Sequence, residues 1–192
     1  DDAIIIGIVT PAAIPADLDS TVKIEGKTQY NQEGGYDTLS NNAIGVDYNY
    51  RSGALNTKIR ATAVYPYSTD FSTDVCVDIK PYAQEDKVCS MTDKTFSKGQ
   101  GAPVAVTKIE PQAMVSQIRY KLTIKNSGNG KVIKGDKVTV SALSDLKQTD
   151  YDYVKIDNGK AKLGNTDGSC KPTEIKLING EGFAFCTFGM SL

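Results

Sequence analysis

Four cysteines are the side chains of this 192-residue chain best suited to chemistry, and they fall into two local pairs. Cys76 lies near Cys89, and Cys170 lies near Cys186. Zinc sites favour closely spaced C-x2-4-C pairs and redox enzymes favour C-x-x-C, and neither spacing occurs here. Two structural disulfides are therefore the preferred interpretation, and they predict a secreted, extracellular protein at the cell surface, because disulfides persist in oxidising compartments.

The disulfide connectivity has three alternatives, as it does for any four cysteines. We favour Cys76–Cys89 together with Cys170–Cys186, because each pair flanks a turn-rich segment between two strand-like runs. Closing loops of this size stabilises a fold by about 3 kcal/mol each in the chain-entropy description.

The sequence lacks the residues and motifs that enzymes most often use for catalysis. The chain has no histidine, which is the usual proton-transfer side chain near neutral pH and the commonest metal ligand. A G-x-S-x-G nucleophile motif is absent, and SKGQG lacks the Gly-Lys-Ser/Thr ending of a phosphate-binding loop. A pair of glycosidase carboxylates would become visible only in the fold, but solvated surface charge is the simpler interpretation of 23 scattered acidic residues. We predict a protein that is not an enzyme and needs no cofactor.

A calcium site is the one metal alternative that the sequence leaves open. Its oxygen ligands would come from the segments TDYDYVKIDNG and GNTDGSC, namely from Asp150, Asp152, Asp157, Asn158, Asn165 and Asp167. Neither segment has the EF-hand spacing, and such residues more often form turns or lie exposed. No metal site is therefore assigned.

Charge argues against nucleic acid as a partner, and hydropathy argues against a membrane-spanning segment. The net charge is −1 and no stretch concentrates Lys or Arg, so nucleic acid is not expected to bind. The longest apolar run, Ala3 to Val9, is far shorter than the ~20 residues that span a bilayer, so this chain is expected to contain no transmembrane segment.

The elements that must position these residues are strands, because apolar residues recur with a period of two. QIRYKLTIK and GFAFCTF are strand-like, and DVCVDIK alternates so that Cys76 would face away from Val75 and Val77. About eleven strands are expected, with one helical turn in SDLKQTDYD. Asn158-Gly159 and Asn179-Gly180 fit type I′ hairpin turns. The predicted fold is all-β, an Ig-like, Greek-key β-sandwich with an extended N-terminal strand.

Tyrosines occur in pairs two residues apart, which places each pair on one face of a strand. They are Tyr48 and Tyr50, Tyr65 and Tyr67, and Tyr151 and Tyr153, with Tyr82 alone. A half-buried sheet face is the simpler interpretation, and an exposed tyrosine row would instead be a contact surface.

The N-terminal run AIIIGIV differs from the other strands because it is apolar at every position. Its residues are Ala3, Ile4, Ile5, Ile6, Gly7, Ile8 and Val9. One interpretation is a core strand of the same sandwich. The other is a donor strand that completes the sheet of a neighbouring copy, with the segment from Pro11 to Pro15 as a stiff connector.

The expected domain organisation follows from this second interpretation. Residues 1–20 would form an arm and linker, and residues 21–192 the β-sandwich. The Gly- and Pro-rich segment SKGQGAP offers an internal boundary near residue 100, or equally one long loop in a single domain.

Part of the chain is similar to a known group of proteins. From Arg60 to about Val132, the runs ATAVYPYSTDFSTDVCVDIKPY, KVC, GQGAPVAVTKIEP and YKLTIKNSGNGKVI resemble uncharacterised surface proteins of DPANN-type archaea. That resemblance extends to the Cys170 and Cys186 region and implies neither an enzyme activity nor a ligand. In organisation alone, the chain also resembles donor-strand subunits of archaeal bundling pili and threads.

These observations together predict a structural subunit of an extracellular filament, which polymerises when Ala3 to Val9 insert into the next copy. The expected partners are copies of the same chain and other cell-surface components. The alternative is an adhesion or binding module, monomeric or tethered through a separate anchor. A metal-dependent lectin-like domain or an enzyme is a third class.

Overall fold

The structure is a computed structural model in which the chain forms two compact units. The N-terminal unit comprises Asp1–Ser68 and Gly135–Lys147, and the C-terminal unit comprises Thr69–Lys134 and Gln148–Leu192. The structure describes residues 3–9, 20–23, 30–31, 33, 35–38, 60–78, 80, 82–84, 86–97, 102–114, 116–135 and 145–189.

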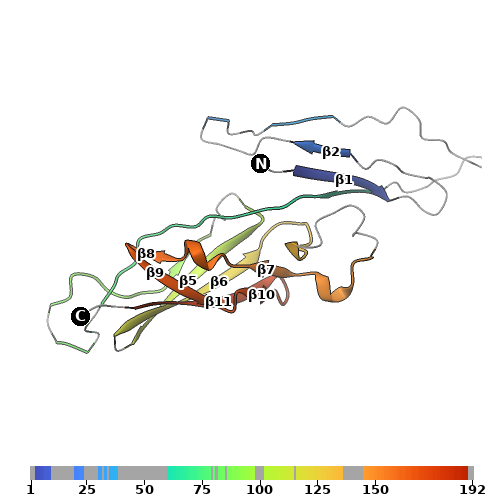
Figure 1. The fold of residues 1–192 in the computed structure, drawn as a ribbon. Helices are drawn as coiled ribbons and strands as arrows, with labels where there is room; N and C mark the ends of the chain where they lie inside the picture. The colour runs from blue at the N-terminus through green and yellow to red at the C-terminus, as the bar shows by residue number, and fades with distance from the viewer. Residues whose placement is uncertain are drawn as a thin grey trace, which may run out of the picture. The chain divides into compact units, whose positions relative to one another are not determined.

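The described part of the N-terminal unit contains a three-stranded antiparallel sheet (Figure 1). Its strands are β1 (Ala3–Val9), β2 (Ser20–Lys23) and β3 (Arg60–Val64), in the order β2-β1-β3. The apolar run at the start of the chain is therefore the central strand of this sheet.

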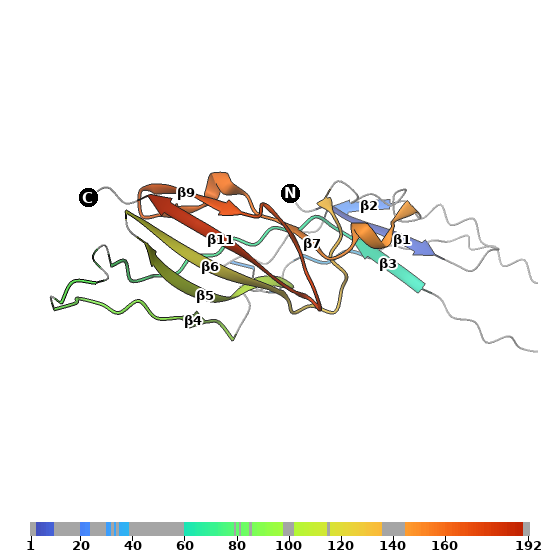
Figure 2. The same ribbon diagram turned by 90° about the horizontal axis from the view of Figure 1, so that it is seen from below.

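The C-terminal unit is built on a six-stranded antiparallel sheet in the order β4-β5-β6-β11-β9-β8 (Figure 2). The three long strands are β5 (Val104–Met114), β6 (Gln117–Asn126) and β11 (Glu181–Gly189), and the shorter ones are β4 (Lys94–Thr95), β9 (Thr166–Lys171) and β8 (Lys162–Leu163). A two-stranded sheet pairs β7 (Tyr153–Lys155) with β10 (Glu174–Lys176). The all-β class is confirmed, whereas the Ig-like, Greek-key sandwich stays a prediction.

The core of the C-terminal unit lies against one face of the six-stranded sheet, in two clusters. One cluster contains Ile109, Ile118, Tyr120, Cys170, Cys186 and Phe188, and the other contains Ile124, Ile175, Leu177 and Ala184. On β11 the buried residues alternate with exposed or half-buried ones, as period-two patterning predicts for a sheet covered on one side. The covering side chains include Phe71 and Val75 from an extended segment and Val154 from β7.

One of the two expected hairpin turns is found. Asn179 and Gly180 have φ values of 54° and 79°, and Ile178 pairs with Glu181 across them, as a type I′ turn requires. Asn158-Gly159 instead begins the 3-10 turn η4 (Asn158–Lys160). The Asp157 carboxylate accepts a bond from the Gly159 N–H at 3.0 Å, and this local bond competes with a hairpin.

The predicted helical turn is found, whereas the predicted alternation in DVCVDIK is not. The 3-10 turn η3 (Gln148–Asp150) lies inside SDLKQTDYD, where one helical turn was predicted. The described part of DVCVDIK is extended but belongs to no strand, and Val77 is exposed while Val75 packs against the core. Alternation on that segment was a wrong guide because its described residues form no ladder with a neighbouring strand.

The division into units differs from the expected one. The described residues of the segment 1–20 belong to the N-terminal unit, where β1 pairs with β2 and β3. The arm and linker over residues 1–20 stay a prediction. The point near residue 100 lies outside the described residues, but β4 and β5 on either side of it pair in one sheet.

Candidate functional site

The predicted assembly strand, β1, has hydrogen-bonded neighbours on both edges. Ile5 is paired with Thr21 of β2 and with Val64 of β3, and Ile6 is paired with Ser20 and Ala63 in the same way. All seven predicted residues, Ala3 to Val9, lie in this strand. Main-chain pairing on both sides is the environment that a donor strand enters in donor-strand complementation, and here the same chain supplies both edges.

Both disulfides have the preferred connectivity. Cys76 is bonded to Cys89, and Cys170 is bonded to Cys186. Cys170 and Cys186 are direct partners in the β9–β11 ladder, with their Cα atoms 3.9 Å apart, and both are buried. The second disulfide therefore staples two neighbouring strands of the core sheet, whereas the first closes a surface loop.

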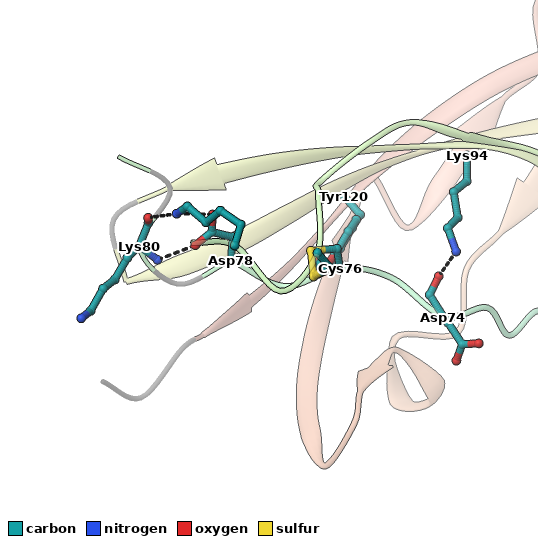
Figure 3. Close-up of a disulfide and its surroundings, with 8 residues drawn as sticks. Asp74, Cys76, Asp78, Lys80, Lys94 and Tyr120 are labelled. Atoms are coloured by element: carbon teal, nitrogen blue, oxygen red, sulfur yellow. Dashed lines mark hydrogen bonds and ion pairs between the residues drawn. A yellow bond between two sulfur atoms is a disulfide. The ribbon is translucent and has the colours of Figure 1, made fainter. Parts of the chain in front are cut away.

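That surface loop, residues 76–89, is the first candidate for a recognition surface (Figure 3). Tyr82 and Val88 are almost fully exposed on it. Within the loop, the Lys87 ammonium donates to the Asp78 carboxylate at 2.7 Å and to the carbonyl of Lys80. The N–H of Lys80 also donates to Asp78, at 2.9 Å. The exposed side chains therefore lie on a segment that the disulfide closes and that this small network links across its described residues.

Electrostatics within the loop follow from these bonds. The hydrogen bond from Lys87 is the largest of the effects that hold the pKa of Asp78 below its usual value, and the Lys80 N–H contributes next. A carboxylate with two donors stays charged in mild acid. The network therefore persists in mild acid.

A surface hollow of about 330 Å³ lies beside the Cys76–Cys89 disulfide. Its lining includes Met91, Ile109 and Pro111 as well as the two cysteines. The Tyr120 hydroxyl donates to the Cys76 carbonyl at 3.2 Å, and Lys94 donates to the Asp74 carbonyl (Figure 3). Burial raises the pKa of Tyr120, so the hydroxyl remains a donor. These two bonds tie the extended segment before the loop to β6 and β4.

The described tyrosines of these pairs have different local surroundings. Tyr65 and Tyr67 are about half exposed and meet edge to face with ring centroids 6.1 Å apart. The ammonium groups of Lys134 and Lys176 each lie over the Tyr153 ring, at 4.5 and 4.7 Å from its centroid. Tyr48 and Tyr50 lie outside the described residues.

The oxygen ligands considered for calcium have local structural roles. Asp157 caps η4, the Asn158 side chain accepts from the Cys170 N–H at 2.8 Å, and Asp167 lies 3.6 Å from Lys162. Among the described residues, no three His, Cys, Asp or Glu side chains gather as a metal site would require.

One feature that the sequence reasoning missed is on the outer face of the six-stranded sheet. Phe183 and Phe185 lie there with ring centroids 5.7 Å apart, and Arg119 and Lys121 of β6 lie over their rings. The signal was present in GFAFCTF, since alternation that buries Ala184 and Cys186 must turn both phenylalanines outward.

Comparison with known proteins gives no relative for this chain: no family model, curated protein or solved structure matches it. In the part of the chain that the structure describes, no helix is long and apolar enough to cross a membrane.

Proposed function

We propose that this chain is a structural subunit of an extracellular filament in which β1 of one copy pairs between β2 and β3 of the next. The observation that carries the proposal is the sheet order β2-β1-β3. An unbroken apolar strand occupies the place where two neighbouring strands each offer a hydrogen-bonding edge.

Exchange of this strand between copies would conserve its contacts. Each main-chain bond that β1 makes to β2 and β3 within one copy can be remade with the same residues of a neighbour, which is the energetic basis of domain swapping. The free energy of exchange is then set by the new contacts between copies and by the connector. Open, head-to-tail exchange produces a fibre rather than a closed dimer.

The connector between β1 and β2 supports the same proposal. Residues 10–19 include Pro11 and Pro15, each of which fixes φ and disfavours helix in the residue before it. Ten residues span at most about 35 Å when extended, so the exchange requires that β1 of one copy and the sheet of the next lie within that reach.

Paired cysteine substitutions test the exchange. The pairs Ile5→Cys with Val64→Cys and Ile6→Cys with Ala63→Cys are consecutive in the β1–β3 register. Hydrogen-bonded and closer, non-hydrogen-bonded positions alternate along an antiparallel ladder, so one of the two pairs suits a disulfide. Mild oxidation of assembled protein, followed by non-reducing electrophoresis, should give a ladder of covalent multimers, and electron microscopy should show filaments.

The matched control is Ile6→Cys with Arg60→Cys. Arg60 is the partner of Val9, three positions along the ladder from Ile6 and about 10 Å away, which is too far for a disulfide. Cross-linked monomer alone from the in-register pairs, or the absence of filaments, would refute the exchange.

A second candidate function is a cell-surface adhesion or binding module. The disulfide-closed loop 76–89 favours it, because Tyr82 and Val88 are exposed on a covalently fixed frame. Preordered loops lose little entropy on binding. If the protein stays monomeric, the substitution Tyr82→Ala should reduce its retention on cell surfaces without changing its thermal stability.

A further inference from the structure

The outer face of the six-stranded sheet carries a platform of aromatic and cationic side chains. We define this platform as Phe183 and Phe185 of β11, Arg119 and Lys121 of β6, and Lys171 of β9. Phe183 is 52% exposed, although β11 buries its alternate residues in the core. A large apolar ring left in water on an otherwise well-packed strand marks a candidate contact surface.

Cations border the phenylalanine row on both sides. The Arg119 guanidinium carbon lies 5.6 Å from the centroid of Phe185, and the Lys121 ammonium lies 5.4 Å from that of Phe183. On the other side of β11, Lys171 is the direct ladder partner of Phe185 and is exposed. With strands about 4.8 Å apart, the two cationic borders are about 10 Å from each other.

Part of this positive charge is unpaired. Lys121 shares Glu110 with Lys108, at 3.0 Å in each case. Arg119 and Lys171, by contrast, have no ion-pair partner among the described residues, and Nε of Arg119 is buried without a hydrogen-bond acceptor. Guanidinium groups bind carboxylates through paired hydrogen bonds, so the complementary ligand is an anion. The neighbouring phenylalanine rings favour an anion that also has an apolar face.

The pairing of β11 on both edges further limits the kind of ligand that can bind. β11 is paired with β6 on one edge and β9 on the other, so the platform offers no free backbone groups to add a peptide strand. Recognition must use side chains alone. We propose that the platform binds an acidic polysaccharide, a chain of uronic acids whose sugar faces lie on Phe183 and Phe185 and whose carboxylates lie beside Arg119 and Lys171.

Polygalacturonate is the probe, and its binding to the purified full chain is measured by calorimetry at low ionic strength. Dextran serves as a neutral polysaccharide and polyglutamate as an acidic peptide. We expect binding to polygalacturonate, weakening with salt, and little or none to the other two. Lys171→Gln should weaken it about threefold, in the range of one exposed charge contact, and Phe183→Ser about fivefold.

The control variant is Lys160→Gln, which removes the same charge from an exposed position in the 3-10 turn η4. Its affinity should match that of the unchanged protein, and all variants should keep the same thermal transition. No binding of polygalacturonate, equal binding of dextran, equal or tighter binding of polyglutamate, or an equal loss in Lys160→Gln would each overturn the proposal. None of these measurements depends on whether β1 is exchanged between copies.

Discussion

Replacing Gly168 with alanine is the substitution whose cost the structure defines most directly. Gly168 of β9 lies opposite Phe188 of β11, and a Cβ at this position would lie 2.2 Å from Cε1 and 2.5 Å from Cδ1 of the Phe188 ring. Real Cβ atoms essentially never come closer than 3.0 Å to another heavy atom, so the ring or the strand must shift.

Neither partner can shift easily. Phe188 is 6% exposed, and its ring meets Tyr120 edge to face at 6.1 Å. β9 is fixed to β11 by the Cys170–Cys186 disulfide, two residues from the clash. Overpacking a well-filled core costs about 1–3 kcal/mol, and we expect Gly168→Ala to lie near 3 kcal/mol.

Differential scanning calorimetry measures this cost. For a unit of this size, about 3 kcal/mol lowers Tm by roughly 10 °C or more. Gly189→Ala on β11 is the matched control, because its Cβ meets nothing within 4 Å, and it should change stability by less than about 0.5 kcal/mol. In the Phe188→Leu background, Gly168→Ala should cost clearly less. An unchanged Tm for Gly168→Ala, or strict additivity with Phe188→Leu, would refute the steric argument.

Three further predictions concern the loop and its anchor. Tyr120→Phe removes the bond to the Cys76 carbonyl and should lower the free energy of unfolding by about 1 kcal/mol in urea titrations. Mild reductant should open the surface disulfide of Cys76 before the buried one of Cys170, as differential alkylation and mass spectrometry would show; the reverse order would contradict the assigned burial. The Asp78 carboxyl should titrate below the usual aspartate pKa by NMR, so its bond to Lys87 is kept at neutral pH and lost only as pH falls through that lowered value; Lys87→Ala should raise the midpoint.

Features that depend on neighbouring residues in sequence could be predicted. The strands β6 and β11 follow from period-two alternation, and the turn at Asn179-Gly180 follows from two residues that tolerate positive φ. The two disulfides join cysteines 13 and 16 residues apart, so local spacing was a sound guide to their connectivity.

Features that depend on distant partners could not be predicted. β9, with the sequence TDGSCK, has no apolar alternation, and it is a strand because β11 supplies the ladder and Gly168 admits the Phe188 ring. DVCVDIK alternates, but its described residues form no ladder with another strand. The role of β1 also depends on β3, which begins more than fifty residues later in the chain.

The positions of the two disulfides leave β1 free of covalent constraint, which matters for the proposed exchange. All four cysteines belong to the C-terminal unit, so neither disulfide constrains the sheet that contains β1. β1 could therefore leave its own copy without any covalent bond breaking and without disturbing the disulfide-linked core.

It follows that the two units should respond separately to substitution. Gly168→Ala should lower the thermal transition of the C-terminal unit and leave the amount of filament unchanged. By contrast, one of the two in-register variants, Ile5→Cys with Val64→Cys or Ile6→Cys with Ala63→Cys, should close a disulfide within the monomer before assembly. That disulfide should block filaments and leave the transition in place.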